Sequence, residues 1–199
     1  MTIKEKLLIY WKPVLTRYIL EKIITATGKR YRPEDLTRNN YIEPIRKGQA
    51  YWNMLSWKPK LGELVAAWYV GDSDYMIGGM SVYNMYGFTT QLAQETKTYT
   101  TSISREVQIF WQRYVFSKIN DTFLYGWEER SVLGYQIRFM SRERAFIEYV
   151  RERFLQPEKD FLEIYESLSS KKLESLLIKY PLKNIIKKIG KIWILFSQK

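Results

Sequence analysis

The spacing of apolar residues divides the beginning of the chain into short helices. Apolar side chains recur every three or four residues in residues 2–11 and again in residues 14–27, as they do along one face of an α-helix. Pro13 follows the first stretch and Gly28 the second, and both residue types end helices. Pro33 with two acids after it is typical of a helical first turn, so we predict a third, short helix there.

Two β-rich runs follow, at residues 41–46 and 49–55, on either side of a turn at Lys47 and Gly48. This arrangement predicts a β-hairpin. Short helices followed by a hairpin with a basic turn are typical of a winged helix-turn-helix domain, whose recognition helix and wing both meet DNA. We therefore predict such a domain over residues 1–58. The alternative is a small α+β domain whose arginines are merely solvated.

The polar, proline-bearing step at residues 56–60 predicts a domain boundary, because the patterning changes beyond it. Residues 61–199 are then a larger α+β domain with a small mixed sheet and several helices. The expected helices cover residues 61–70, 80–86, 141–154, 158–168, 171–180 and 182–196, and the expected strands lie within residues 75–77, 96–101, 107–111 and 135–139.

The distribution of charge indicates what kind of partner the chain binds. The net charge is +11, and residues 1–60 hold 13 Lys and Arg against 5 Asp and Glu. Such an excess predicts a polyanionic partner, here double-stranded DNA. Asparagines could reach base edges, although in loops they are more often turn formers. The residues expected to contact DNA are Lys29, Arg30, Arg32, Arg38, Asn39, Asn40, Arg46 and Lys47.

The last predicted helix, residues 182–196, is amphipathic. Ile185, Ile189, Ile192 and Trp193 fall on one side, and lysines fall largely on the other. Two readings stay open, a docked terminal helix with a solvated lysine face and a surface for a protein partner; a membrane surface is less favoured, because the apolar side is needed to cover the sheet domain. The candidate partner-binding residues are Lys183, Lys187, Lys188 and Lys191.

Missing residue types narrow the chemistry. The chain has no histidine and no cysteine, so it lacks an imidazole base, a thiol nucleophile and an ordinary zinc site. The remaining candidate is a magnesium site at Asp72 and Asp74, although aspartates in a turn usually serve local hydrogen bonding. We expect no catalytic residues, no metal and no cofactor. No apolar run approaches the ~20 residues of a spanning helix, and residues 1–13 lack a signal-peptide core, so we expect a cytoplasmic protein away from membranes.

Four segments together resemble one known family. YMIGGMSVYNMYGFTT, at residues 75–90, looks like the AbiEi family of antitoxin-type transcriptional regulators from prokaryotic type IV toxin-antitoxin systems, which act in phage defence. The segments IEPIRKGQAYW, MSRERAFIEYV and KYPLKNIIKKIG resemble the wing, a helix start and the closing helices of the family. The matching residues are Arg46, Lys47, Gly48, Tyr51, Ser141, Glu143, Arg144, Ala145, Tyr180, Lys183 and Gly190.

The resemblance implies a function for each domain. In the family, the winged domain represses its own operon by binding inverted repeats, and the larger domain supports antitoxicity against a nucleotidyltransferase-type toxin encoded next door. The chain is thus expected to be a non-catalytic antitoxin and autorepressor. Two alternatives stay open: a stand-alone DNA-binding regulator without a toxin, and a magnesium-dependent nuclease or nucleotidyltransferase that uses Asp72 and Asp74.

Overall fold

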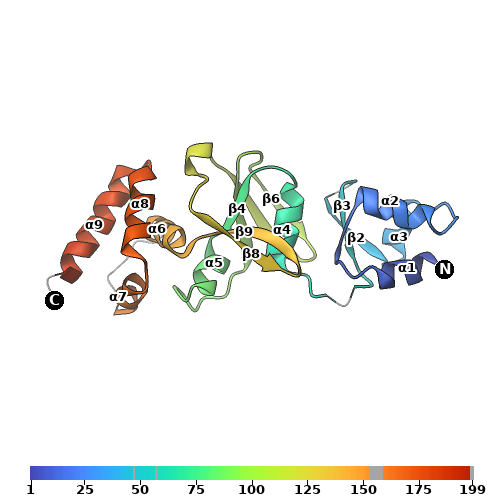
Figure 1. Cartoon of the computed structure of the whole chain (residues 1–199), viewed down its shortest axis with the longest axis horizontal. Helices are drawn as coiled ribbons and strands as arrows, with labels where there is room; N and C mark the ends of the chain where they lie inside the picture. Colours follow the sequence, from blue (N-terminus) through green and yellow to red (C-terminus); the bar gives the residue numbers. More distant parts are fainter. Residues whose placement is uncertain (47, 57, 153–158, 198–199) are drawn as a thin grey trace. The chain divides into compact units, whose positions relative to one another are not determined.

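A computed structural model of the chain describes residues 1–46, 48–56, 58–152 and 159–197, without the side chains of residues 159–162 and 191–197 (Figure 1). Contacts divide these residues into two compact units. The first unit contains Met1–Gly71 and Val132–Tyr135, and the second contains the other described residues from Asp72 onward. Helices and strands occur in both, which confirms the α+β class.

The first unit places a three-stranded antiparallel sheet beside short helices. The sheet order is β1-β3-β2, so the third strand in the sequence lies in the middle. The predicted hairpin is confirmed by β2 and β3, and the short helix at Pro33 by α3. The elements are α1 (Ile3–Ile9), β1 (Val14–Thr16), α2 (Arg17–Thr25), α3 (Pro33–Arg38), β2 (Ile42–Arg46), β3 (Ala50–Asn53) and α4 (Gly62–Val70).

One core joins α1, α2 and α3 to the sheet of this unit. Leu7, Leu15, Leu20 and Leu36 are all buried in it, one each from α1, β1, α2 and α3. The side-chain amide of Asn53, also buried, donates to the backbone oxygen of Leu7 at 2.8 Å. Because a buried amide is costly without a partner, this bond fixes the end of β3 against α1.

Strand β1 corrects the sequence prediction, which placed a helix over residues 14–27. Val14 pairs with Trp52 and Thr16 with Ala50, so these residues are extended. The helix begins at Arg17, because the Thr16 side chain accepts a hydrogen bond from the backbone N–H of Ile19 and caps it.

The contact division also differs from the boundary expected at residues 56–60. It places α4 in the first unit, beyond that linker. Helix α4 contacts β2, and the Nη1 atom of Arg46 donates to the backbone oxygen of Val70 at 3.3 Å. The apolar residues 64–67 of α4 are fully or almost fully buried, so the helix needs such a partner surface.

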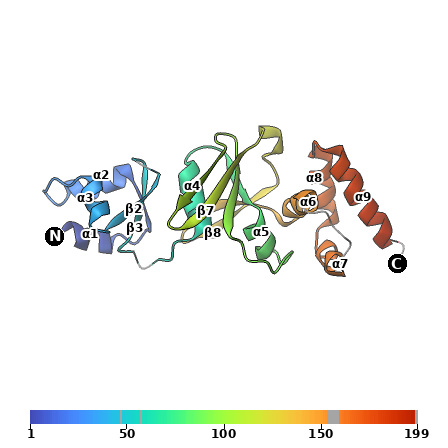
Figure 2. The same cartoon turned by 180° about the vertical axis from the view of Figure 1, so that it is seen from behind.

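The second unit is built on a six-stranded sheet with the order β6-β7-β5-β4-β9-β8 (Figures 1 and 2). Strand β4 runs parallel to β9 and β5 parallel to β7, while β4–β5 and β6–β7 are antiparallel, so the predicted mixed sheet is confirmed. The strands are β4 (Tyr75–Gly78), β5 (Glu95–Thr100), β6 (Arg105–Ile109), β7 (Gln112–Lys118), β8 (Trp127–Val132) and β9 (Tyr135–Met140).

Five α-helices and a short 3₁₀ helix, η1 (Asp121–Phe123), accompany the sheet among the described residues of this unit. Helix α5 contacts β4 and β5, and α6 contacts α5, α8 and α9 (Figures 1 and 2). These α-helices confirm the predicted helices of the second half to within a few residues. They are α5 (Met80–Met85), α6 (Arg142–Glu152), α7 (Lys159–Glu166), α8 (Ser170–Lys179) and α9 (Lys183–Ser197).

Helix α6 has buried charged side chains as well as buried apolar ones. Glu148 is 2% exposed and pairs with Arg144 at 2.6 Å and with Arg151 at 2.5 Å. The Tyr180 hydroxyl donates to Glu148 at 3.1 Å. The Arg144 guanidinium carbon also lies 4.7 Å and 4.9 Å from the ring centres of Tyr125 and Tyr180. This cluster joins α6 to the residue that follows α8.

A second carboxylate lies at the end of α6. Glu152 accepts hydrogen bonds from Lys97 at 2.5 Å and from the Tyr83 and Tyr99 hydroxyls at 2.9 Å. Burial alone would raise the pKa of Glu152, but these bonds outweigh burial and hold its pKa below the usual value. Its contribution to stability is therefore present at neutral pH and is lost as the pH falls through the lowered pKa.

Candidate functional site

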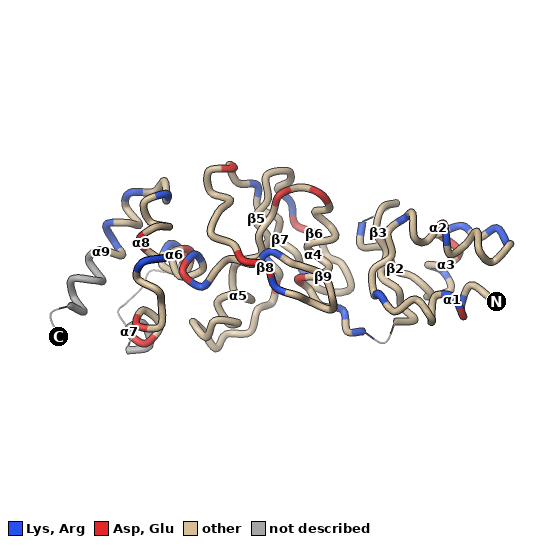
Figure 3. Tube along the Cα trace, viewed as in Figure 1, with Lys and Arg blue, Asp and Glu red and all other residues tan. Residues whose placement is uncertain are grey.

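The turn between α2 and α3 carries the strongest concentration of predicted DNA-contacting residues. Lys29 and Arg30 follow Gly28, whose φ of 69° suits the glycine that ends α2. Arg32 is the N-cap residue of α3. All three cationic side chains are exposed, and we call them the basic turn. Figure 3 shows blue segments of the tube in the loop between α2 and α3. A depression of about 680 Å³ lies here, lined by Ile24, Thr25, Gly28, Lys29, Arg30, Tyr31, Arg32 and Asp35.

The other predicted residues of α3 mainly complete the helix end. The Asn39 side-chain amide donates to the backbone oxygen of Asp35 at 2.8 Å, and Asn40 adopts the left-handed conformation with φ 55°. Both are turn-forming roles. Arg38 remains 81% exposed, with its Nη1 atom 3.8 Å from Asp35. Of these three side chains, Arg38 is therefore the one most available for an external anion.

Of the two predicted wing residues, Arg46 has a hydrogen-bond partner within the first unit. Arg46 is half-buried and donates to the Val70 backbone oxygen, so its guanidinium is engaged inside the first unit. The acceptor lies in the last turn of α4, where backbone carbonyls lack helical partners. The contact of Arg46 with phosphate stays a prediction. Lys47 lies outside the described residues.

The two aspartates of the alternative metal site do not form a ligand cluster. Asp74 accepts a hydrogen bond from Arg138 at 2.8 Å, while the Asp72 side chain is exposed. Within the described ranges, no three acidic side chains lie close enough together to hold a metal ion. Every helix in the same ranges is too short or too polar to cross a membrane.

The closing helix α9 confirms the predicted amphipathic pattern over its first two turns. Ile185 and Ile189 are buried, whereas Lys183 and Lys187 are exposed. Lys188 is half-buried and donates to the backbone oxygen of Val150 at 3.3 Å, so it joins α9 to α6. The side chains of Lys191, Ile192 and Trp193 lie outside the described part. Two of the four candidate partner-binding lysines are thus exposed on one helix.

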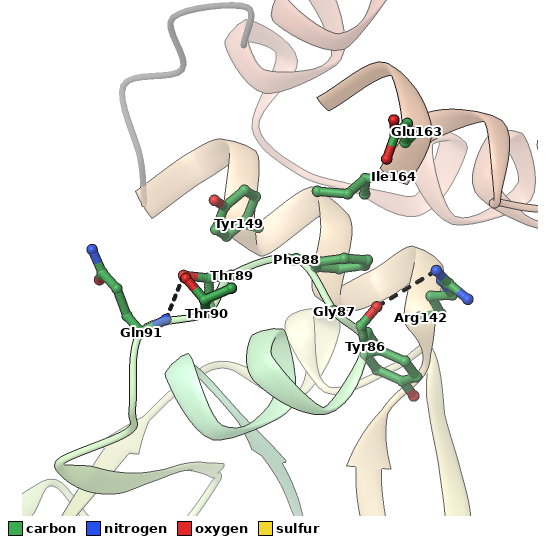
Figure 4. A pocket seen from close by; sticks show the side chains of 10 residues that line it. All are labelled: Tyr86, Gly87, Phe88, Thr89, Thr90, Gln91, Arg142, Tyr149, Glu163 and Ile164. Atoms are coloured by element: carbon green, nitrogen blue, oxygen red, sulfur yellow. Dashed lines mark hydrogen bonds between the residues drawn. The ribbon is translucent and has the colours of Figure 1, made fainter. Parts of the chain in front are cut away.

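The second unit also contains a pocket that the sequence did not indicate. It has a volume of about 790 Å³ and lies between the loop after α5, helix α6 and helix α7 (Figure 4). We call it the Phe88 pocket. Its lining residues are Tyr86, Gly87, Phe88, Thr89, Thr90, Gln91, Arg142, Tyr149, Glu163 and Ile164.

Arg142, the first residue of α6, supplies the positive charge of the pocket. Its Nη2 atom donates to the backbone oxygen of Tyr86 over a long 3.5 Å (Figure 4). Its Nε atom is buried and has no hydrogen-bond partner among the described residues. The guanidinium carbon lies 5.9 Å from the centre of the Phe88 ring. Sequence reasoning missed this site because residues 86–91 and 142 are far apart in the chain.

Comparison with known proteins adds information on the fold. No protein-family model matches the sequence, and no curated protein matches it. The structure is similar to the crystal structure of the RV2827C protein from Mycobacterium tuberculosis, with a TM-score of 0.61 and 16% sequence identity. The match covers 90% of this chain and 71% of that chain. At this identity the similarity shows a shared fold, so the chain has the α+β fold of that mycobacterial protein.

Proposed function

We propose that the chain is a non-catalytic regulator that binds double-stranded operator DNA through residues 1–58. The proposal rests on one observation, which is that the exposed basic turn lies directly before α3. The elements of this domain follow in the order α1, β1, α2, α3, β2 and β3, and β3 lies between β1 and β2 in the sheet. In winged helix-turn-helix domains, the second helix of the motif enters the major groove. By analogy α3 is the reading helix, and the basic turn lies where the phosphate backbone passes.

The charges around α3 indicate how the domain binds. Helix α3 has only six residues, and its first turn contains Glu34 and Asp35. These acids can accept hydrogen bonds only from exposed base amino groups, and they repel phosphate. The basic turn and Arg38 therefore supply most of the attraction, so we expect electrostatic binding with modest sequence discrimination.

The salt dependence of binding tests this proposal. If about six phosphates are neutralised, the logarithm of the binding constant should fall with the logarithm of salt concentration at a slope of roughly −5. Gel-shift titrations of the full chain on its own upstream region measure the slope. A binding constant that does not change with salt concentration would contradict the proposal.

We further propose that the second unit confers antitoxicity, in keeping with the AbiEi resemblance at residues 75–90 and 141–145. The proposed partner is a nucleotidyltransferase-type toxin encoded next door. The alternative of a stand-alone regulator differs in having no such neighbour. The identity of the adjacent reading frame separates these two possibilities.

The two proposed activities should separate in the full chain. A Lys29→Gln/Arg30→Gln/Arg32→Gln variant, expressed from an independent promoter, should lose operator binding and still rescue cells that express the neighbouring toxin. Its exposed substitutions leave the second unit unchanged. Growth of toxin-expressing cells is the measurement, with the wild-type chain as the control. Loss of rescue by the folded variant would mean that protection works through DNA binding.

A further inference from the structure

Strand β6 forms one edge of the six-stranded sheet, where β7 is its partner among the described strands. Ile109 and Gln112 close a two-residue turn, so Ile109, Val107 and Arg105 stand in hydrogen-bonded pairs with β7. The backbone N–H and C=O groups of Glu106 and Gln108 therefore point away from β7, toward the open edge. Such a row of backbone groups can pair with a strand of another chain.

The two edges of this sheet differ in their protection against such pairing. At the opposite edge, β8 has three consecutive charged residues, Glu128, Glu129 and Arg130, and charges on an edge strand discourage pairing. The two charged residues of β6, Arg105 and Glu106, have opposite signs and stand at its beginning, while residues 107–109 are uncharged. Strand β6 also contains neither a proline nor a bulge. It is therefore the edge better suited to accept another strand.

The turn at the end of β6 exposes a large aromatic side chain. Trp111 is 94% exposed. Phe110 and Trp111 have φ values of 52° and 68°, in a turn where asparagine and glycine are the usual residues. Neither the exposed indole ring nor the unfavourable backbone conformation stabilises an isolated chain. Both are explained if the surface of a partner covers Trp111.

The side chains along β6 complement a second copy of the same strand. When two copies pair antiparallel about a two-fold axis at Val107, Glu106 of each copy lies opposite Gln108 of the other, and their outward backbone groups meet. A carboxamide donates hydrogen bonds to a carboxylate, so both outer pairs are complementary. Arg113 lies 2.7 Å from Glu106 and 3.5 Å from Glu95, so its charge is balanced. This balance favours a protein strand over nucleic acid or anionic lipid.

We propose that two copies of the chain associate through their β6 strands, paired antiparallel about Val107, so that the sheet continues from one copy into the other. The hairpin tip of each copy then extends past Arg105 of the other, where Trp111 covers residues 102–104, of which Ile103 is half-buried. Five residues a side make a small interface, so we expect association at micromolar concentrations. The inference does not depend on DNA binding, because all these residues belong to the second unit.

Sedimentation velocity of the full chain from ~1 to ~200 μM tests the proposal. The wild type should change reversibly from monomer to dimer over this range. Gln108→Pro removes the outward N–H group and leaves the inward groups of β6 paired with β7, so the fold should persist while the dissociation constant rises at least about tenfold. A wild type that stays monomeric throughout, or that grows beyond a dimer, would overturn the proposal.

Charge-exchange variants test the register. Gln108→Glu places two carboxylates opposite each other in both outer pairs and should weaken association about fivefold. Adding Glu106→Lys turns these pairs into Lys–Glu pairs and should restore most of the lost affinity. Gln136→Glu adds the same charge at an exposed position of β9 and should leave association unchanged. Failure of Glu106→Lys to restore association would contradict the two-fold pairing at Val107.

Trp111→Gly tests the hairpin tip. Glycine suits the second turn position, so at ~1 μM the variant should unfold at a temperature about 2 °C or more above the wild type. Its dissociation constant should nevertheless rise at least about tenfold, because buried tryptophans dominate interfaces. A lower unfolding temperature would show that Trp111 packs within its own chain and would contradict its role. A dimer unchanged by both folded Gln108→Pro and folded Trp111→Gly would place the interface elsewhere.

Discussion

Replacing Lys29, Arg30 and Arg32 together by glutamine is expected to weaken binding to duplex DNA about a hundredfold in ~0.15 M salt. The salt slope should change from roughly −5 to between about −2 and −3, since each lost phosphate contact removes about one unit. The three side chains are exposed in the turn before α3, so glutamine should not disturb the core. Gel-shift titrations at several salt concentrations measure both quantities.

A charge-matched variant makes this prediction specific. Lys171→Gln/Lys183→Gln/Lys187→Gln removes the same charge from exposed positions of α8 and α9. Its affinity for DNA should stay within about threefold of the wild type, because contacts to phosphate act locally and distant charges are screened. Equal losses in both triple variants would show that overall charge, rather than the basic turn, attracts the DNA.

The wing is a less decisive place for mutation than the sequence suggests. From the sequence alone, an Arg46→Ala/Lys47→Ala double variant is the natural test of phosphate contact, because the wing of such domains contacts the DNA backbone. However, Arg46 donates to the Val70 backbone oxygen, so its removal also disturbs the contact between β2 and α4. A loss of DNA binding in that variant could come from a lost phosphate contact or from a disturbed β2–α4 contact. Substitutions in the basic turn do not have this ambiguity.

Local sequence signals predicted most helices and failed at three strands. Strand β1 has only three residues and continues directly into a helix. Because apolar residues have helical spacing from Leu15 onward, the sequence predicts helix over the strand as well. The turn between β6 and β7 consists of Phe110 and Trp111, both with positive φ, where glycine or asparagine is usual. Without a turn signal, the residues around it suggested one strand rather than two. Strand β8, WEERSV, contains mainly polar residues and lies at a sheet edge.

The candidate sites differ in how far the sequence could reveal them. The basic turn is contiguous, so charge counting found it. The Phe88 pocket requires the loop after α5 to meet the start of α6 and a turn of α7, and only tertiary packing brings them together. Nothing in the sequence indicates the surroundings of the acids of α6, of which Glu148 is 2% exposed between two arginines. An amphipathic pattern does not indicate that the polar face of a helix will also be covered.

Glu148→Gln is therefore expected to lower the free energy of unfolding by about 3–5 kcal/mol, the usual cost of breaking a buried ion pair from one side. The substitution preserves volume but leaves Arg144, 1% exposed, without its counter-charge. The Nε and Nη1 atoms of Arg144 already lack hydrogen-bond partners, so no described side chain is in place to replace Glu148. Urea unfolding followed by far-ultraviolet circular dichroism measures the change.

Two further variants show whether charge balance is the cause. Glu174→Gln removes an exposed carboxylate from α8 and should change stability by less than about 0.5 kcal/mol. An Arg144→Met/Glu148→Met double variant removes both buried charges and should be more stable than Glu148→Gln alone, because uncharged pairs of similar volume avoid the desolvation penalty. If Glu148→Gln behaves like Glu174→Gln, the carboxylate does not balance the arginines, and aromatic packing of Arg144 between Tyr125 and Tyr180 must hold α6 in place.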